Sequence, residues 1–185
     1  MNVHFKVDGY AITVHPSSYQ ETLFNTFNAL FSCAKFLSLA QQFHAHIIIN
    51  GLYREVFYGS NITNAYVQSG SLPLATEAFD QITAKNLHSW NTIIAGYSKC
   101  CFYVYVLKLF RDLRSDGNAV DSFNLVFAIK ARQRLMFLHN ERLLHCLAIK
   151  SGLEGDLSIV PALLDMYAEL GSLNDAHKLF DDILT

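Results

Sequence analysis

Charged residues are scarce in this chain of 185 residues, where they make up 16% of the sequence and hydrophobic residues 51%. Ordinary soluble domains carry about a quarter charged residues. The net charge of −2 provides no overall positive field, which argues against strong unspecific binding to nucleic acid but leaves room for a local basic track. No uncharged apolar run reaches the ~18 residues of a membrane helix, so no membrane span is expected.

Signatures of catalysis and of metal binding are missing as well. The sequence has no glycine-rich phosphate loop, no nucleophile elbow and no HExxH motif, and its histidines, cysteines and carboxylates do not show ligand spacing. Four cysteines without a CxxC pair, two of them adjacent at Cys100 and Cys101, favour reduced thiols over a disulfide framework. We therefore expect no enzymatic activity, metal, cofactor or small-molecule substrate.

Residues 1–20 lack the features of a targeting peptide. They show neither the arginine-rich amphipathic pattern of an organelle transit peptide nor the long apolar run of a secretory signal. We expect a loosely ordered leader there.

An internal repeat organises the rest of the chain. The segment Ser69–Ile82, SGSLPLATEAFDQI, returns as Leu170–Ile183, LGSLNDAHKLFDDI, and the same offset of 101 residues relates His44 to His145. A looser copy, LKLFRDL, lies between them and divides the offset into periods in the low thirties. Such periods are typical of stacked two-helix units, each of which relies on its neighbours to bury its apolar face. We interpret the two histidines as packing residues of the repeat.

Helical spacing of apolar residues predicts ten helices and no strand. The expected helices cover residues 21–33, 37–50, 57–67, 72–82, 89–99, 102–114, 123–134, 137–150, 159–169 and 173–184. Turn glycines such as Gly70 tolerate the left-handed backbone that ends a helix, and Cys101 replaces the turn glycine of the third pair. We expect a large residue of the second helix, Phe79, Phe110 or Phe180, to fill the core of its unit.

The units resemble the pentatricopeptide repeat of plant organelle RNA-binding proteins. Leu87–Lys99, LHSWNTIIAGYSK, with the following LKLFRDLRSDG, resembles the standard repeat; Gln42–Leu52, QFHAHIIINGL, resembles its long variant, and Val160–Phe180 the short one. The alternation of lengths is that of the PLS subclass, which mixes these variants. The resemblance implies an all-α, right-handed superhelical solenoid of about five helix-turn-helix repeats, at residues 21–55, 56–86, 87–121, 122–156 and 157–185.

The resemblance also implies a function. The chain would be a non-catalytic, sequence-reading adaptor that binds single-stranded RNA in the editing, modification or processing of RNA in mitochondria, or alternatively in plastids. Other RNA-processing proteins are implied as further partners. Two alternatives stay open: a helical-repeat scaffold whose groove binds a protein, and a truncated, inactive product, since the final unit stops about two residues early.

In this family the fifth and the last residue of a unit together read one base. By resemblance, the pairs are Ser60 with Asn86, Asn91 with Asp121, Val126 with Asp156, and Pro161 with a partner beyond the given sequence; the first unit stays unassigned. The resemblance implies uracil for Asn91 with Asp121 and adenine for Ser60 with Asn86. Val126 and Pro161 have no polar side chain with which to read. From the residues alone, the ordinary interpretation of Asn91 is a helix-start cap or an exposed polar residue.

Two further sets of residues follow from the resemblance. The second residue of each unit is expected to sandwich the bases by stacking or apolar contact; these residues are Phe57, His88, Phe123 and Ser158. Cations near the ends of the first helices are expected to contact phosphates; these are Lys99, Lys130, Arg132 and Arg134. The short units have Gln68 and Glu169 at the equivalent places, so the basic track is half complete.

Overall fold

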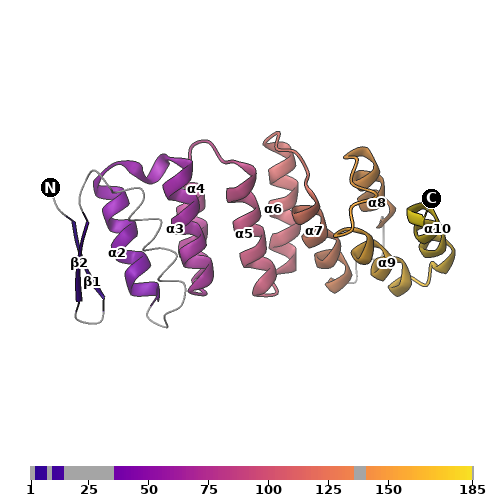
Figure 1. Ribbon diagram of the computed structural model, residues 1–185, viewed down its shortest axis with the longest axis horizontal. Coiled ribbons are helices and arrows are strands. Elements are labelled where there is room, and N and C mark those ends of the chain that lie inside the picture. The colour runs from indigo at the N-terminus through magenta and orange to yellow at the C-terminus, as the bar shows by residue number, and fades with distance from the viewer. Residues whose placement is uncertain (1–2, 8–9, 15–35, 136–140, 185) are drawn as a thin grey trace. The chain divides into compact units, whose positions relative to one another are not determined.

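Helices form most of the described structure. The computed structural model describes residues 3–7, 10–14, 36–135 and 141–184. In these ranges nine α-helices follow one another (Figure 1): α2 (Phe36–Ile49), α3 (Val56–Gln68), α4 (Leu72–Asp80), α5 (Leu87–Lys99), α6 (Tyr103–Ser115), α7 (Ser122–Arg134), α8 (Glu141–Lys150), α9 (Val160–Glu169) and α10 (Leu173–Leu184), with a short 3-10 helix, η2 (Leu52–Arg54), after α2. The predicted all-α repeat fold is therefore confirmed, while the helix expected at 21–33 lies outside the described residues.

The structure adds two strands near the N-terminus. β1 (Val3–Val7) and β2 (Tyr10–Val14) pair antiparallel, with Val3 opposite Val14. The expectation of no strand is wrong for this segment. Apolar and polar residues alternate along β1, and the intervening sequence is Asp-Gly, a combination that favours a hairpin.

The chain divides into two compact units, Met1–Lys85 and Asn86–Thr185. In the first unit α3 packs against both α2 and α4. In the second unit α7 packs against α5, α6, α8 and α9, and α9 packs against α10. The core of the second unit contains fully buried side chains from different helix pairs, such as Leu125 and Ile129 of α7 and Leu163 of α9. Each pair thus completes its core with a neighbouring pair, as stacked repeats do.

The helix ends use one backbone conformation repeatedly. Gly70 and Gly171 have φ angles of 76° and 67°, and in both turns the next amide donates to the carbonyl oxygen five residues earlier at 2.9 Å. Cys101 has a φ of 62° and the same hydrogen bond follows it, also at 2.9 Å. Its role as the substitute for a turn glycine is confirmed, although a Cβ is strained in this left-handed region.

A hydrogen bond between histidine and tyrosine recurs at the repeat offset. His44 Nδ1 lies 2.9 Å from the hydroxyl oxygen of Tyr66, and His145 Nδ1 lies 2.6 Å from that of Tyr167. The rings of both pairs meet edge to face, with centroids 5.5 and 5.6 Å apart. Each bond joins the second helix of one pair to the first helix of the next. The interpretation of both histidines as packing residues is confirmed.

Two of the three expected core phenylalanines are buried. Phe79 on α4 is 2% exposed and Phe110 on α6 is 5% exposed, whereas Phe180 on α10 is 51% exposed. The prediction that Phe180 fills the core is therefore wrong. Phe110 is covered because it packs in a cluster with residues of α7, the first helix of the next pair. The described residues include no following helix that could cover Phe180 in the same way.

Replacing Cys101 by glycine should stabilise the protein. The change removes the Cβ from the left-handed turn, and we expect a gain of about 1 kcal/mol, offset in part by the greater freedom of glycine in the unfolded chain. Thermal melting should show a midpoint raised by roughly 2–4 °C. Cys100→Gly is the matched control, because Cys100 has a φ of −90° and gains nothing from the loss of its Cβ. Equal effects of the two changes would contradict the assignment of strain to Cys101.

Phe79→Ala and Phe180→Ala should differ sharply in their effect. The first removes a buried ring and leaves a cavity, which we expect to cost about 3–5 kcal/mol of unfolding free energy. The second removes a ring that is half in solvent and should cost less than about 1 kcal/mol. Denaturant unfolding of both variants beside the wild type measures the difference. Similar losses would mean that the burial of these two residues does not decide their contribution.

Acid should weaken the packing around His44. Burial lowers the pKa of His44 below its usual 6.5, against smaller raising effects of the Gln81 side chain and the Glu77 carboxylate. The unfolded chain therefore binds a proton that the folded chain does not, so this contribution to stability is complete above about pH 6.5 and falls as the pH drops toward the lower folded pKa. An NMR titration should give the His44 ring a pKa below 6.5; a value at or above 6.5 would refute this prediction.

Candidate nucleic-acid interface

The structure brings Asn91 and Asp121 into direct contact. Asn91 lies on α5, Asp121 is the N-cap residue of α7, and the Asn91 Nδ2 atom donates to the Asp121 Oδ2 atom at 2.7 Å. The two helices pack against each other. The pair lies toward their N-terminal ends, because Asn91 is the fifth residue of α5 and Asp121 directly precedes α7. Both side chains are half-buried. The fifth and the last residue of the predicted unit 87–121 thus form one polar pair with a partly exposed edge.

Asp121 also holds the start of α7. Its Oδ1 atom accepts a hydrogen bond from the Asn124 backbone amide at 2.8 Å, and the Asn124 Oδ1 atom accepts one from the Asp121 amide at 3.3 Å. This reciprocal arrangement is a capping box. In addition, the Asn124 Nδ2 atom donates to the Asn91 Oδ1 atom at 3.3 Å. Asn91, Asp121 and Asn124 therefore form a closed polar cluster, in which backbone amides complete the contacts between Asp121 and Asn124.

Sequence reasoning did not single out Asn124. A signal was present, because an aspartate followed three residues later by an amide at the start of an apolar helix is the pattern of a capping box. The pattern identifies the cap, but only the packing of α7 against α5 brings Asn124 to Asn91.

The predicted pair Ser60 and Asn86 differs from the first. Ser60 on α3 is 4% exposed, and its hydroxyl has no hydrogen-bond partner among the described residues. Asn86 is exposed and is the N-cap residue of α5, where its side chain accepts a hydrogen bond from the Ser89 amide at 2.9 Å. Asn86 thus has the same capping role as Asp121.

The remaining predicted readers lie in different surroundings. Val126 packs against the buried apolar cluster of the second unit. Asp156 accepts a hydrogen bond from the Ser158 amide at 2.8 Å, and the Ser158 hydroxyl also donates to it. These hydrogen bonds lower the pKa of Asp156. Pro161 is exposed in the first turn of α9.

Three of the four predicted base-sandwiching residues present ring surface at helix starts. Phe57 at the start of α3 and Phe123 at the start of α7 are 43% and 48% exposed. His88 at the start of α5 is exposed as well. Phe123 rests edge to face on Phe127, with ring centroids 4.8 Å apart. Ser158 precedes α9 and offers no ring, so the last unit has no comparable surface.

The four cations predicted to contact phosphates differ in their exposure to solvent. Lys99 and Arg134 are exposed and are the last residues of α5 and α7, where a cation also interacts favourably with the helix dipole. Lys130 is exposed and shares a face with Arg134, one turn away, whereas Arg132 is half-buried and points to the other side of α7.

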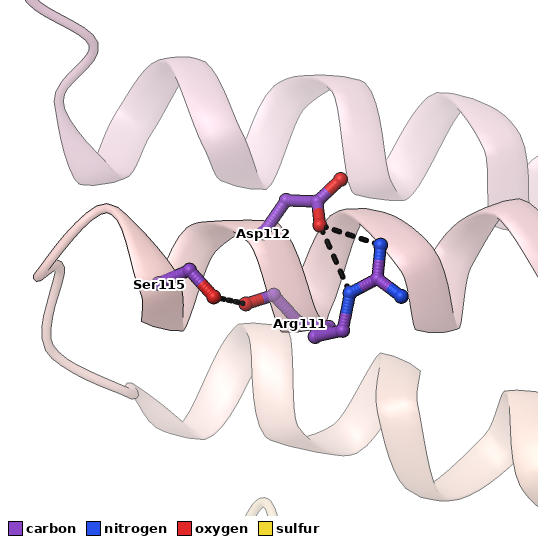
Figure 2. A network of polar contacts seen from close by, with 3 residues as sticks. All are labelled: Arg111, Asp112 and Ser115. Carbon is purple, nitrogen blue, oxygen red and sulfur yellow. Dashed lines mark hydrogen bonds and ion pairs between the residues drawn. The ribbon is translucent and has the colours of Figure 1, made fainter.

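Arg111 lies on α6, the helix that follows α5, and its charge is already neutralised by a neighbouring carboxylate. Figure 2 shows Arg111 of α6 turned toward Asp112, where its Nε and Nη2 atoms lie 3.1 and 2.9 Å from the Asp112 Oδ1 atom. The Ser115 hydroxyl donates to the Arg111 carbonyl oxygen at 3.1 Å. Such an exposed ion pair adds little stability, but it leaves Arg111 less suited to a phosphate than Lys99 or Arg134.

The described part of the chain has neither a metal-ligand cluster nor a membrane-spanning helix. Within it, no three His, Cys, Asp or Glu side chains gather as metal ligands. The helices described there are also too short or too polar to cross a bilayer.

Comparisons with known proteins identify the repeat. The profile of the PPR repeat matches residues 88–118 and 162–185. The chain is 49% identical over 158 residues to pentatricopeptide repeat-containing protein At1g06140, mitochondrial, of Arabidopsis thaliana, an alignment that covers 83% of this chain and 28% of the relative.

Further relatives from Arabidopsis thaliana agree. The chain is 32% identical to pentatricopeptide repeat-containing protein At3g09040, mitochondrial, over 85% of this chain and 16% of the relative. It is 33% identical to pentatricopeptide repeat-containing protein At1g71460, chloroplastic, over 86% of this chain and 24% of the relative. The chain thus spans less than a third of the length of these relatives. With helix pairs that share their cores and with these similarities, the chain belongs to the pentatricopeptide repeat family.

Proposed function

We propose that this chain binds single-stranded RNA as a non-catalytic adaptor that reads individual bases. The observation that carries the proposal is the contact between Asn91 and Asp121. One amide N–H of Asn91 is used by Asp121, which leaves a second N–H donor and one lone pair of Oδ1 in the amide plane. A donor beside an acceptor in one plane matches the hydrogen-bonding edge of a base, and uracil offers N3–H beside a carbonyl oxygen.

The surroundings of this pair suit a single strand. Phe123 and His88 present exposed rings at the starts of the two helices that hold the pair, and base stacking on such rings is worth roughly 1–3 kcal/mol per base. Lys99 and Arg134 lie at the other ends of the same helices, where they would attract the phosphates. With a net charge of −2, we expect weak, salt-sensitive binding, micromolar or poorer.

We further propose that the protein acts in organelle RNA metabolism, in editing, modification or processing and alongside other RNA-processing proteins. Relatives that match most of this chain are named mitochondrial or chloroplastic, and the mitochondrion is our first choice because the relative of 49% identity carries that name. The alternating lengths of the units support assignment to the subclass with standard, long and short repeats.

The reading pair can be tested by exchanging its chemistry. In the Asn91→Ser, Asp121→Asn double variant, the unit copies Ser60 with Asn86, and an asparagine at 121 can still cap α7. We expect wild type to prefer uracil over adenine by about tenfold at one nucleotide of a short single strand, and the double variant to shift that preference toward adenine. Fluorescence anisotropy titrations at fixed low salt measure both rankings.

Two controls decide how the titrations are interpreted. Asn174→Ser changes an exposed amide of α10 and should leave the ranking unchanged, and duplex RNA should not bind because its bases are paired. If wild type and double variant bind RNA and rank the strands identically, Asn91 and Asp121 do not read the base. If no RNA binds while a protein partner does, the chain is a protein-binding scaffold.

A further inference from the structure

Asn124 is the third residue of the predicted unit 122–156, and its side chain is completely buried. Its Nδ2 atom donates to Asn91 Oδ1, and its backbone amide and Oδ1 atom complete the capping box with Asp121. A buried amide is costly unless it is hydrogen-bonded. Asn124 meets this requirement partly through Asn91 and Asp121.

The cluster fixes the direction of the Asn91 amide. A carboxylate can only accept hydrogen bonds, so the NH₂ group of Asn91 must face Asp121. The Asn91 oxygen is then held by the donor of Asn124 on the other side. Without that donor the Asn91 side chain keeps one anchor instead of two and can rotate away from the plane in which it meets a base.

The equivalent positions of the neighbouring units follow the polarity of the reading residue. Ser89, the third residue after the pair Ser60 and Asn86, is polar and fully buried. Ile159, at the same position after Val126 and Asp156, is apolar and fully buried.

The apolar case differs in its surroundings. Val126 packs against the apolar cluster to which Ile159 belongs, whereas Asn91 accepts a hydrogen bond from Asn124. Along the sequence, a polar third residue thus follows each pair with a polar reader, and an apolar third residue follows the pair with Val126.

We propose that Asn124 is a positioning residue for base recognition, so that the unit 87–121 selects its base through Asn91, Asp121 and Asn124 together. This inference rests on the proposed function and deepens it. The ligand is a nucleobase whose edge offers an N–H donor next to a carbonyl acceptor. Uracil and guanine present such an edge and adenine and cytosine do not, and of the two we expect uracil, the base that the family resemblance implies.

The test compares Asn124→Leu, which keeps the size of the side chain but removes the donor, with wild type. The 185-residue chain and its variant are titrated against single-stranded RNAs that carry uracil, cytosine, adenine or guanine at the nucleotide read by this unit. We expect the preference of about tenfold for uracil to fall below about threefold. Binding to the best strand should weaken by less than that preference, because the phosphate and stacking contacts are retained.

Three comparisons separate positioning from a structural role. Asn174→Leu makes the same exchange on exposed α10 and should change no ranking. The ranking at the neighbouring nucleotide, read by Ser60 and Asn86, should also be unchanged in Asn124→Leu. If Asn124→Leu melts below the assay temperature, Asn124→Ser replaces it, because serine occupies the equivalent buried position at Ser89; a serine hydroxyl reaches less far, and the uracil preference should again fall.

The outcomes distinguish this inference from the function on which it rests. If a folded Asn124 variant keeps the wild-type preference for uracil while Asn91→Ala loses it, the pair reads the base alone and the inference is overturned. If the neighbouring nucleotide loses its ranking to the same extent, Asn124 acts only on stability and the inference fails as well. If the wild type binds no RNA, the proposed function itself fails.

Discussion

Satisfying the backbone amides at the helix starts is the constraint on which the site depends. The first amides of a helix have no partner within it, and Ser89 and Asn124, in the first turns of α5 and α7, are completely buried, so water does not replace a missing acceptor. Asn86 and Asp121 supply it from the residue before each helix. Because Asp121 must stand at this place to cap α7, its second oxygen is brought to Asn91 at no further cost in ordering.

The rest of the scaffold keeps these helix starts in register. Left-handed turns at Gly70, Cys101 and Gly171 end the first helices in the same way, each followed by a hydrogen bond to the carbonyl oxygen five residues earlier. The bonds from His44 to Tyr66 and from His145 to Tyr167 then tie one pair to the next. Both devices recur with the repeat, so the packing of one unit predicts that of its equivalent.

Most of the fold was predictable from the sequence because its signals are local and repeated. The exposed Phe180 shows the limit: its place in the repeat equals that of Phe79, but burial depends on the helix that lies against it. The strands β1 and β2 were missed because alternation over five residues is a weak signal beside a long helical pattern. The family resemblance paired Asn91 with Asp121 as readers of one base, and the structure brings their side chains into contact. The resemblance predicted neither the burial of Ser60 nor the contact of Asn124 with Asn91, since both depend on packing between helices.

In the proposed function one side chain, that of Asp121, is both cap and reader, and this limits the residue types that can stand there. A good N-cap is Ser, Thr, Asp or Asn, so the last residue of a unit is chosen from a short list before any base is considered. Within that list Asp only accepts hydrogen bonds, whereas Asn both donates and accepts. An aspartate such as Asp121 therefore dictates how its partner amide is turned, and an asparagine such as Asn86 does not. The exchange of one capping residue for another can thus alter recognition while the helix start is preserved.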